Sequence, residues 1–332
     1  MTGLLIIVLS GMLTATFAVP LRFSREWAWE NTWLVYATVA FVLMPFAFAA
    51  SVLYHPFGFY RSLPLRDYIA PVLFGLGWGT AQVTFGIAIT RVGMAMAFAI
   101  VIGLSALLGS SLPLVLFHPW ELAGNAGAWL IASAALLIIG LTLYGRAGIE
   151  RERASGKHSR RIAWTGLLLC VFTGCFGSMI NIGFVSGHDI ARRAIEEGVS
   201  PGEATLAVWA VVLAAGYFPN LIYTAYLLRR NDSGRLFKRS VFRELPLAIA
   251  AALLWLFGML GYGMGASIMG KLGDSLGFAI CMAVLLLWSS ALGIMSGEWK
   301  GVSQGILVQM RAGLLLIIGS TSILGMSSLV RR

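Results

Sequence analysis

The sequence predicts an all-α integral membrane protein whose ten transmembrane helices form two five-helix repeats of opposite orientation. Two observations predict this class: an apolar composition, and a short segment that recurs in the second half of the chain. Of the 332 residues, 58% are hydrophobic and 11% are charged, and the mean hydropathy is +0.84. A soluble domain carries about 25% charged residues. This chain therefore has too few polar side chains to cover a surface that faces water.

Apolar runs of about 18 residues or more recur along the chain, and each is long enough to cross a hydrocarbon core of roughly 30 Å. Backbone groups in lipid must find their hydrogen-bond partners within the segment, so each run is expected to be a helix. We expect the spans at residues 3–21, 33–54, 68–90, 93–117, 126–145, 162–185, 204–228, 245–268, 274–296 and 312–330.

The net charge of +10 is distributed unevenly between the two sides of the membrane. Most of the 24 lysines and arginines fall in the loops after the odd-numbered spans, above all in residues 146–161 and 229–243. Basic loops mark the cytoplasmic side, so both termini are expected to face outward. This distribution accounts for the basic charge, and we expect no nucleic-acid partner.

The recurring segment reads "RVGMAMAFAI" at residues 91–100 and "KLGDSLGFAI" at residues 271–280. Arg91 and Lys271 fall at two tight junctions that are five spans apart. Because five is odd, the second copy must cross the membrane in the opposite sense. The predicted organisation is a first repeat over 1–147, a cytoplasmic linker over 148–161, and a second, inverted repeat over 162–332. Inverted repeats are typical of secondary transporters, whose substrate site lies near the midplane between the halves.

Several motifs resemble one family of transporters. "WAWENTW" (27–33), "WGTAQVTFGIAITRVGMAM" (78–96), Asn181 followed by His188 and Asp189, and "GEW" (297–299) are similar to motifs of the L-rhamnose–proton symporter family. That family is a ten-span branch of the drug/metabolite transporter superfamily. The resemblance implies a bacterial inner-membrane protein that takes up a neutral monosaccharide, L-rhamnose or a similar deoxy-sugar, by alternating access, with protons as the coupling ion and no other cofactor.

One segment departs from the family pattern. "GMLGYGMGASIMG" (258–270) consists mostly of glycine and small residues, where the family is rich in aromatic and polar groups. The alternative function is therefore export or facilitated diffusion of another small metabolite. An integral-membrane transferase would need a cluster of carboxylates or a His/Asp constellation, and the sequence offers neither, so no enzyme is expected. The expected partners are a small sugar and the lipid bilayer, with the protein a monomer or a homodimer.

Polar side chains inside lipid-embedded helices mark candidate substrate pathways. Trp78 and Gln82 are four apart on one helical face, and an aromatic ring beside an amide suits the C–H faces and hydroxyls of a sugar. Asn181 and Ser178 share a face of the sixth span. The alternative for each of them is helix packing or a hydrogen bond between helices.

Two further residues complete the set of substrate-binding candidates. Tyr262 corresponds to Gln82 at the offset that relates the two copies of the repeat. Asn220 follows Pro219, and a proline within a helix frees backbone groups. Asn220 is therefore either a pocket residue or the partner of those groups.

Proton coupling requires a titratable group, and four residues are candidates. Asp274 lies at the outer end of the ninth span, where the alternative is an acid stabilised by the helix dipole. His188 and Asp189 are neighbours on an outer loop, and histidine titrates near physiological pH. Glu30 lies between tryptophans at the cytoplasmic interface, where the alternative is a salt bridge to Arg22 or Arg25.

The paired glycines and the three cysteines are expected to be packing residues within the helices. Gly75/Gly79 and Gly261/Gly265 have the small-xxx-small spacing that allows helices to approach closely. The three cysteines, Cys170, Cys175 and Cys281, lie in apolar spans without a CxxC motif or a neighbouring histidine, so neither a redox pair nor a metal site is expected.

Overall fold

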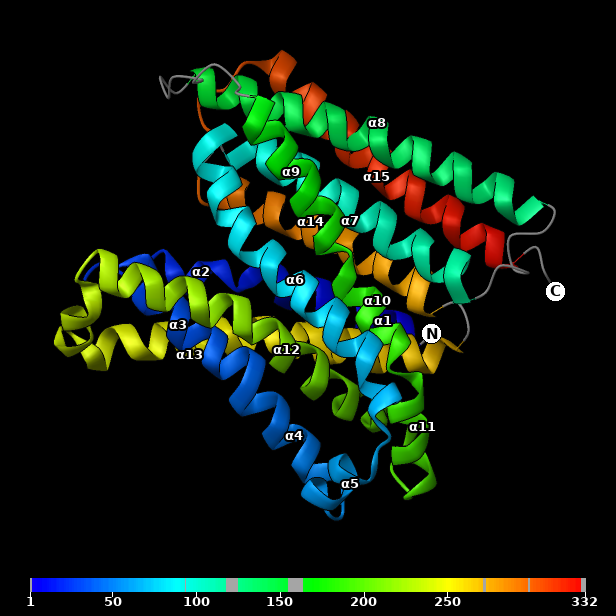
Figure 1. The fold of residues 1–332 in the computed structure, drawn as a ribbon. Helices are drawn as coiled ribbons and strands as arrows, with labels where there is room; N and C mark the ends of the chain where they lie inside the picture. Colours follow the sequence, from blue (N-terminus) through cyan, green and yellow to red (C-terminus); the bar gives the residue numbers. More distant parts are fainter. Residues whose placement is uncertain are drawn as a thin grey trace.

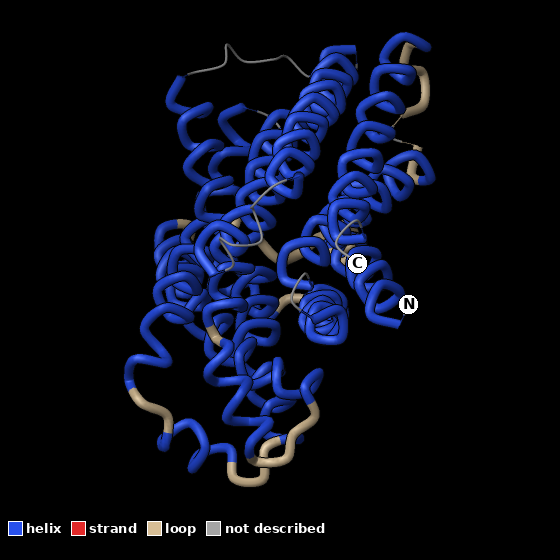
Figure 2. Tube along the Cα trace, turned by 90° about the vertical axis from the view of Figure 1, so that its right-hand side faces the viewer, coloured by secondary structure: helices blue, strands red, loops and turns tan. Residues whose placement is uncertain are grey.

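The computed structural model describes residues 2–92, 94–117, 125–154, 164–270, 273–297 and 299–329, and this part of the chain is helical with no strand (Figure 2). Its elements are α1 (Thr2–Thr16), α2 (Ala18–Leu21), α3 (Trp29–Thr38), the π-helical turn η1 (Val39–Leu43), α4 (Met44–Val52), α5 (Pro56–Ser62), α6 (Leu65–Val92), α7 (Met94–Phe117), α8 (Asn125–Ala154), α9 (Trp164–Gly177), α10 (Met179–Ser186), α11 (His188–Glu196), α12 (Pro201–Arg230), the 3-10 helix η3 (Ser233–Lys238), α13 (Val241–Met269), the π-helical turn η5 (Gly273–Gly277), α14 (Phe278–Met295) and α15 (Gln304–Leu329).

Within the described residues, seven helical stretches are long and apolar enough to cross a membrane. They are Thr2–Leu21, Trp29–Val52, Ile131–Arg151, Trp164–Glu196, Pro201–Arg230, Val241–Met269 and Phe278–Met295. Shorter apolar helices run over Ile100–Pro113 and Gln304–Ser320. The protein is therefore an all-helical, multi-pass membrane protein, as the composition predicted, and the count of ten spans stays a prediction.

Several rods are interrupted or extended relative to the sequence-based spans. Ser178 separates α9 from α10 within the expected span 162–185, and η1 interrupts the second rod. Such breaks and π-turns leave backbone groups outside the regular ladder and often lie at functional sites. α8 continues to Ala154, so residues 148–154 of the expected linker are helical. The Arg151 guanidinium lies 4.8 Å from the centre of the Trp299 ring, a cation–π contact that ties this extension to the segment before α15.

The rods pack in pairs that join distant parts of the chain (Figure 1). α8 lies along α15, α1 lies along α13 and α14, and α6 lies between α9–α10 and α12. α1 begins and α15 ends at the same, right-hand end of the molecule in Figure 1. The largest apolar core is shared by α3, α4, α6, α12 and α13, and a smaller one joins α7, α8, α14 and α15. The substrate-binding candidates lie on α6, α10, α12 and α13, with Ser178 at the break before α10.

Glycines allow the closest of these helix contacts. A Cβ atom at Gly79 would lie 2.2 Å from the carbonyl oxygen of Gly216 on α12, and one at Gly265 would lie 2.9 Å from the carbonyl oxygen of Gly3 on α1. Only glycine permits such an approach of two backbones. The packing role expected for the small-xxx-small pairs is confirmed at these positions.

Candidate functional site

The break between α9 and α10 carries two of the predicted residues. Ser178 lies at the break, is buried, and its hydroxyl donates a hydrogen bond to the carbonyl oxygen of Cys175 at 2.6 Å. This bond is local and supports the bend. Asn181 lies in the first turn of α10, and its side chain is fully buried.

Asn181 connects three helices. Its Nδ2 atom donates to the carbonyl oxygen of Gly109 on α7 at 2.7 Å, and its Oδ1 atom accepts a short hydrogen bond from the hydroxyl of Tyr262 on α13. An asparagine side chain can donate twice and accept twice, so this amide has the capacity to exchange its protein partners for hydroxyl groups of a ligand. The structure thus brings together two residues that the sequence could propose only separately.

Aromatic rings surround the Asn181–Tyr262 pair. The ring centre of Tyr262 lies 5.7 Å from that of Phe184, 6.3 Å from that of Trp209 and 5.6 Å from that of Phe278. Phe184 and Trp209 stack on each other with centres 4.7 Å apart. None of these side chains is charged. The arrangement can therefore present amide and hydroxyl groups, framed by ring faces, to a neutral polar molecule.

Gln82 is not hydrogen-bonded to the Asn181–Tyr262 pair. It is half-buried on α6, and its amide makes no hydrogen bond within the part of the chain that the structure describes. Two residues further along α6, and therefore on a different face of the helix, Thr84 accepts a hydrogen bond from the Thr173 hydroxyl of α9 at 2.8 Å. The Gln82 amide is thus not used in a hydrogen bond among the described residues, which leaves it available to a ligand.

Trp78 belongs to a packed aromatic group. It is 2% exposed, it stacks on Trp255 with ring centres 5.5 Å apart, and its ring lies edge-on to Phe41 at 5.0 Å. A Cβ atom at Gly216 would lie 2.6 Å from the Trp78 ring, so α12 closes over it. These contacts agree with the packing alternative for Trp78.

Asn220 is held entirely by protein groups. Its Oδ1 atom accepts from the indole N–H of Trp33 at 2.9 Å, and its Nδ2 atom donates to the carbonyl oxygens of Gly216 at 2.9 Å and Gly79 at 3.2 Å. The residue is fully buried. These bonds tie α3, α6 and α12 together, which agrees with the alternative that Asn220 serves backbone groups.

Among the coupling candidates, Glu30 is the most enclosed. The residue is 4% exposed, and its carboxylate accepts hydrogen bonds from Asn231 at 2.9 Å and from the hydroxyl of Ser233 at 2.6 Å. The expected alternative was an ion pair with Arg22 or Arg25, whereas these partners are neutral donors at the turn between α12 and α13. Glu30 thereby fastens the start of α3 to that turn.

The other coupling candidates lie at the opposite end of the rods. His188 and Asp189 begin α11, with His188 Nε2 3.6 Å from Asp189 Oδ2 and side chains that are 69% and 40% exposed. The backbone of Asp274 lies in η5, and its side chain lies outside the described residues. Lys271, one of the two repeat junctions, also lies outside them.

The described residues form neither a metal-binding cluster nor a cysteine pair. No group of three or more histidine, cysteine, aspartate or glutamate side chains lies close enough there to hold a metal ion. Cys170, Cys175 and Cys281 are unpaired thiols.

Comparison with known proteins identifies the family. The family model described as L-rhamnose-proton symport protein (RhaT) matches residues 1–329. Curated relatives named L-rhamnose-proton symporter include those of Escherichia coli O17:K52:H18 (strain UMN026), 23% identical over 321 residues, and of Klebsiella pneumoniae (strain MGH 78578), 24% identical over 321 residues. Each alignment covers 94% of this chain and 93% of the relative.

The chain belongs to the L-rhamnose-proton symport protein family. The family consists of symporters, so this member is a transporter and not an enzyme. The transferase alternative is thereby excluded. The identity of 23–24% limits how far a substrate can be carried over from those relatives.

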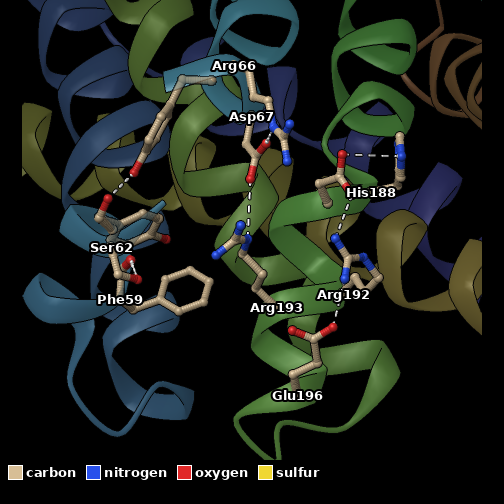
Figure 3. A network of polar contacts seen from close by, with 11 residues as sticks. Phe59, Ser62, Arg66, Asp67, His188, Arg192, Arg193 and Glu196 are labelled. Carbon is tan, nitrogen blue, oxygen red and sulfur yellow. Dashed lines mark hydrogen bonds and ion pairs between the residues drawn. The ribbon is translucent and has the colours of Figure 1, made fainter. Parts of the chain in front are cut away.

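In this symporter-family member the structure shows a buried carboxylate that sequence reasoning missed. Asp67, in the first turn of α6, has a side chain that is 3% exposed, and its oxygens lie 3.3 Å from Arg193 Nε on α11 and 3.5 Å from Arg66 Nε. Figure 3 shows the Asp67 and Arg193 side chains pointing toward each other across the two helices. The pair joins the first half of the chain to the second at the end that carries His188.

A second network lies next to this ion pair on α11. Arg192 pairs with Asp189 at 3.1 Å and with Glu196 at 2.7 Å, and all three side chains are at least 40% exposed (Figure 3). Exposed pairs of this kind contribute about 0–1 kcal/mol each. They lie on the exposed face of the amphipathic helix α11.

Glu244 is the other acid that sequence reasoning missed. It lies in the first turn of α13, is fully buried, and accepts hydrogen bonds from the Ser24 hydroxyl and from the backbone N–H groups of Arg25 at 3.1 Å and Glu26 at 3.2 Å. Glu30 of α3 is thus bound by the turn that precedes α13, and Glu244 of α13 is bound by the loop that precedes α3. Both glutamates lie in the first turn of a helix, which the sequence could have indicated, but only the fold shows which loop binds each carboxylate.

One apolar groove of the described residues lies away from the Asn181–Tyr262 pair. A groove of about 650 Å³ between α4, α5, α6 and α12 is lined by apolar and tyrosine side chains. It contains none of the predicted binding residues, and Asn181 and Tyr262 are themselves buried.

Proposed function

We propose that this protein takes up a neutral monosaccharide, L-rhamnose or a similar deoxy-sugar, together with protons, by alternating access. The observation that carries the proposal is the match of the symport family model to residues 1–329. The buried Asn181–Tyr262 pair supports it, because an amide and a hydroxyl among uncharged rings suit a neutral polyol.

The helix contacts support an inverted repeat of five plus five spans. If the halves are related by a two-fold axis, α1 exchanges with α9–α10, α6 with α13, and α7 with α14. The contacts of α1 with α13 and α14 are then matched by those of α9–α10 with α6 and α7. The axis maps α8 onto α15, which pack along each other. Two such halves can rock about a site near the midplane, with the drug/metabolite transporter fold as the proposed architecture.

Asn181 contributes to the proposed site from the second half, and Gln82 would contribute from the first. When a sugar binds, Asn181 exchanges its hydrogen bond with the Tyr262 hydroxyl for one with a sugar hydroxyl. Among the coupling candidates, His188 and Asp189 have the solvent contact that proton exchange requires. The loops with Glu30 and Glu244, rich in arginine, are proposed to face the cytoplasm, with the termini outside and the protein in the bacterial inner membrane.

Transport by purified protein in liposomes tests the proposal. We expect counterflow of labelled L-rhamnose, and uptake that accelerates when the outside is made acidic. A panel of monosaccharides identifies the preferred sugar. Counterflow without any effect of a pH gradient would favour a facilitator, and net efflux driven by an inward proton gradient would favour an exporter. Failure to exchange any sugar refutes the proposal.

A further inference from the structure

Trp209 of α12 has a buried indole N–H group without a partner. The side chain is fully buried, and Nε1 has no hydrogen-bond acceptor among the described residues. Three other indoles have one: Trp27 donates to the carbonyl oxygen of Arg239, Trp33 to Asn220 and Trp288 to Thr16. A buried donor without an acceptor is unfavourable for folding, and such exceptions are rare enough in native proteins to need an explanation.

The unpartnered N–H group lies in the wall of the Asn181–Tyr262 site. Trp209 stacks on Phe184, and its ring lies edge-on to that of Tyr262, whose hydroxyl donates to Asn181. The indole, the phenol and the amide therefore form one continuous group contributed by α12, α13 and α10.

Gly263 controls the space in front of the indole nitrogen. It directly follows Tyr262, and a Cβ atom there would lie 2.3 Å from Trp209 Nε1 and 3.3 Å from the Thr205 hydroxyl oxygen. Any side chain at this position would fill the space that faces the N–H group. The glycine lets α13 lie against the indole, and a separation of α12 from α13 would leave the N–H group facing open space.

We propose that Trp209 is a substrate-binding residue whose indole N–H donates a hydrogen bond to a hydroxyl oxygen of the transported sugar. The inference rests on the proposed function and adds a residue to its site. The indole N–H can only donate, and a sugar hydroxyl is an acceptor that also offers a C–H face to aromatic rings. With no charged side chain among Asn181, Phe184, Trp209 and Tyr262, the site takes a neutral polyol rather than a sugar acid or a sugar phosphate.

The test compares the same substitution at two tryptophans, each of which loses its indole N–H and part of its ring volume. Trp209→Phe removes the unpartnered N–H, and Trp33→Phe removes one that is bonded to Asn220. Each variant is purified, and its thermal unfolding is measured with increasing concentrations of the sugar that stabilises the wild type most in a monosaccharide panel. We expect Trp209→Phe to lose some stability, because the smaller ring leaves a cavity at a fully buried site, and to bind the sugar about tenfold more weakly. Trp33→Phe should unfold at a lower temperature and keep the wild-type affinity.

The outcomes separate the inference from the proposed function. Sugar affinity of Trp209→Phe within twofold of the wild type overturns the inference and leaves the proposed function standing. A wild type that no sugar of the panel stabilises, and that shows no counterflow, refutes the proposed function and the inference with it. If Trp209→Phe does not fold, wild-type protein labelled with ¹⁵N-tryptophan decides: a sugar acceptor moves an indole N–H signal downfield, and no such movement overturns the inference.

Discussion

Replacing Asn220 by leucine should destabilise the protein without changing its affinity for sugar. Leucine has a similar shape but neither accepts nor donates a hydrogen bond. The substitution removes the bonds from Trp33 and to the carbonyl oxygens of Gly216 and Gly79, all at 2.9–3.2 Å in a fully buried position. It therefore tests whether Asn220 joins helices or contacts the substrate.

The size of the effect follows from which partners are left without a bond. The two carbonyl oxygens lie within helices and keep their backbone donors. The Trp33 N–H has no such second partner and loses its acceptor, which costs about 1–3 kcal/mol. With the loss of the two weaker bonds, the free energy of unfolding should fall by about 2–4 kcal/mol. That corresponds to a roughly 30- to 700-fold change in the unfolding equilibrium constant.

Reversible unfolding in mixed detergent micelles measures this difference, and sugar-dependent thermal stabilisation measures the affinity. Trp33→Phe in the Asn220→Leu background should restore part of the stability, because removing both partners leaves no buried donor unpaired. Strictly additive losses in the double variant would show that the bond to Trp33 is not what Asn220 contributes. An Asn220→Leu protein of normal stability that no longer binds sugar would assign Asn220 to the substrate site.

Three further substitutions test the packing and the buried acids. Gly79→Ala should lower the free energy of unfolding by about 1–3 kcal/mol, because its Cβ would lie 2.2 Å from a carbonyl oxygen of α12. Gly86→Ala on the same helix meets no atom within 4 Å and should be neutral or slightly stabilising in the same unfolding assay; equal effects would contradict the close contact. A double-mutant cycle of Asp67→Ala and Arg193→Ala should give a coupling of about 1–3 kcal/mol that decreases with salt, and zero coupling would show that the pair contributes nothing. Glu30→Gln should lower stability by about 1–2 kcal/mol, because the neutral amide oxygen accepts the bonds from Asn231 and Ser233 more weakly than the carboxylate does, yet uptake should still respond to a pH gradient; a folded variant that had lost this response would make Glu30 a coupling residue.

The sequence predicted the class of fold well because lipid restricts the choice of structure. A composition with 11% charged residues and long apolar runs leaves helices as the only way to satisfy the backbone in a membrane. The small-xxx-small spacing of Gly79 and Gly265 also predicted close contacts correctly, since a missing side chain acts in the same way whichever helix approaches. The breaks at Ser178 and in η1 carry no comparable signal in this sequence.

The candidate site could be predicted only as separate residues. Asn181 stood out as a polar residue in an apolar span, and Tyr262 through its correspondence to Gln82 in the repeat; the structure joins the two in one hydrogen bond. Asn220 stood out for the same reason as Asn181, although its bonds go to Trp33 and to backbone oxygens. Trp209 did not stand out, because a tryptophan in an apolar span is normally a packing residue. Only the structure shows that its N–H group has no acceptor among the described residues.

The sequence by itself therefore determined that this is a helical membrane transporter of the symport family, since length, hydropathy and motif are local properties of the chain. Only the tertiary structure decided which polar atoms have partners. A hydrogen bond or an ion pair such as Asp67–Arg193 depends on which helices become neighbours, and the two partners can lie more than a hundred residues apart. For that reason the unpartnered N–H of Trp209, on which the proposed sugar contact rests, became visible only in the folded protein.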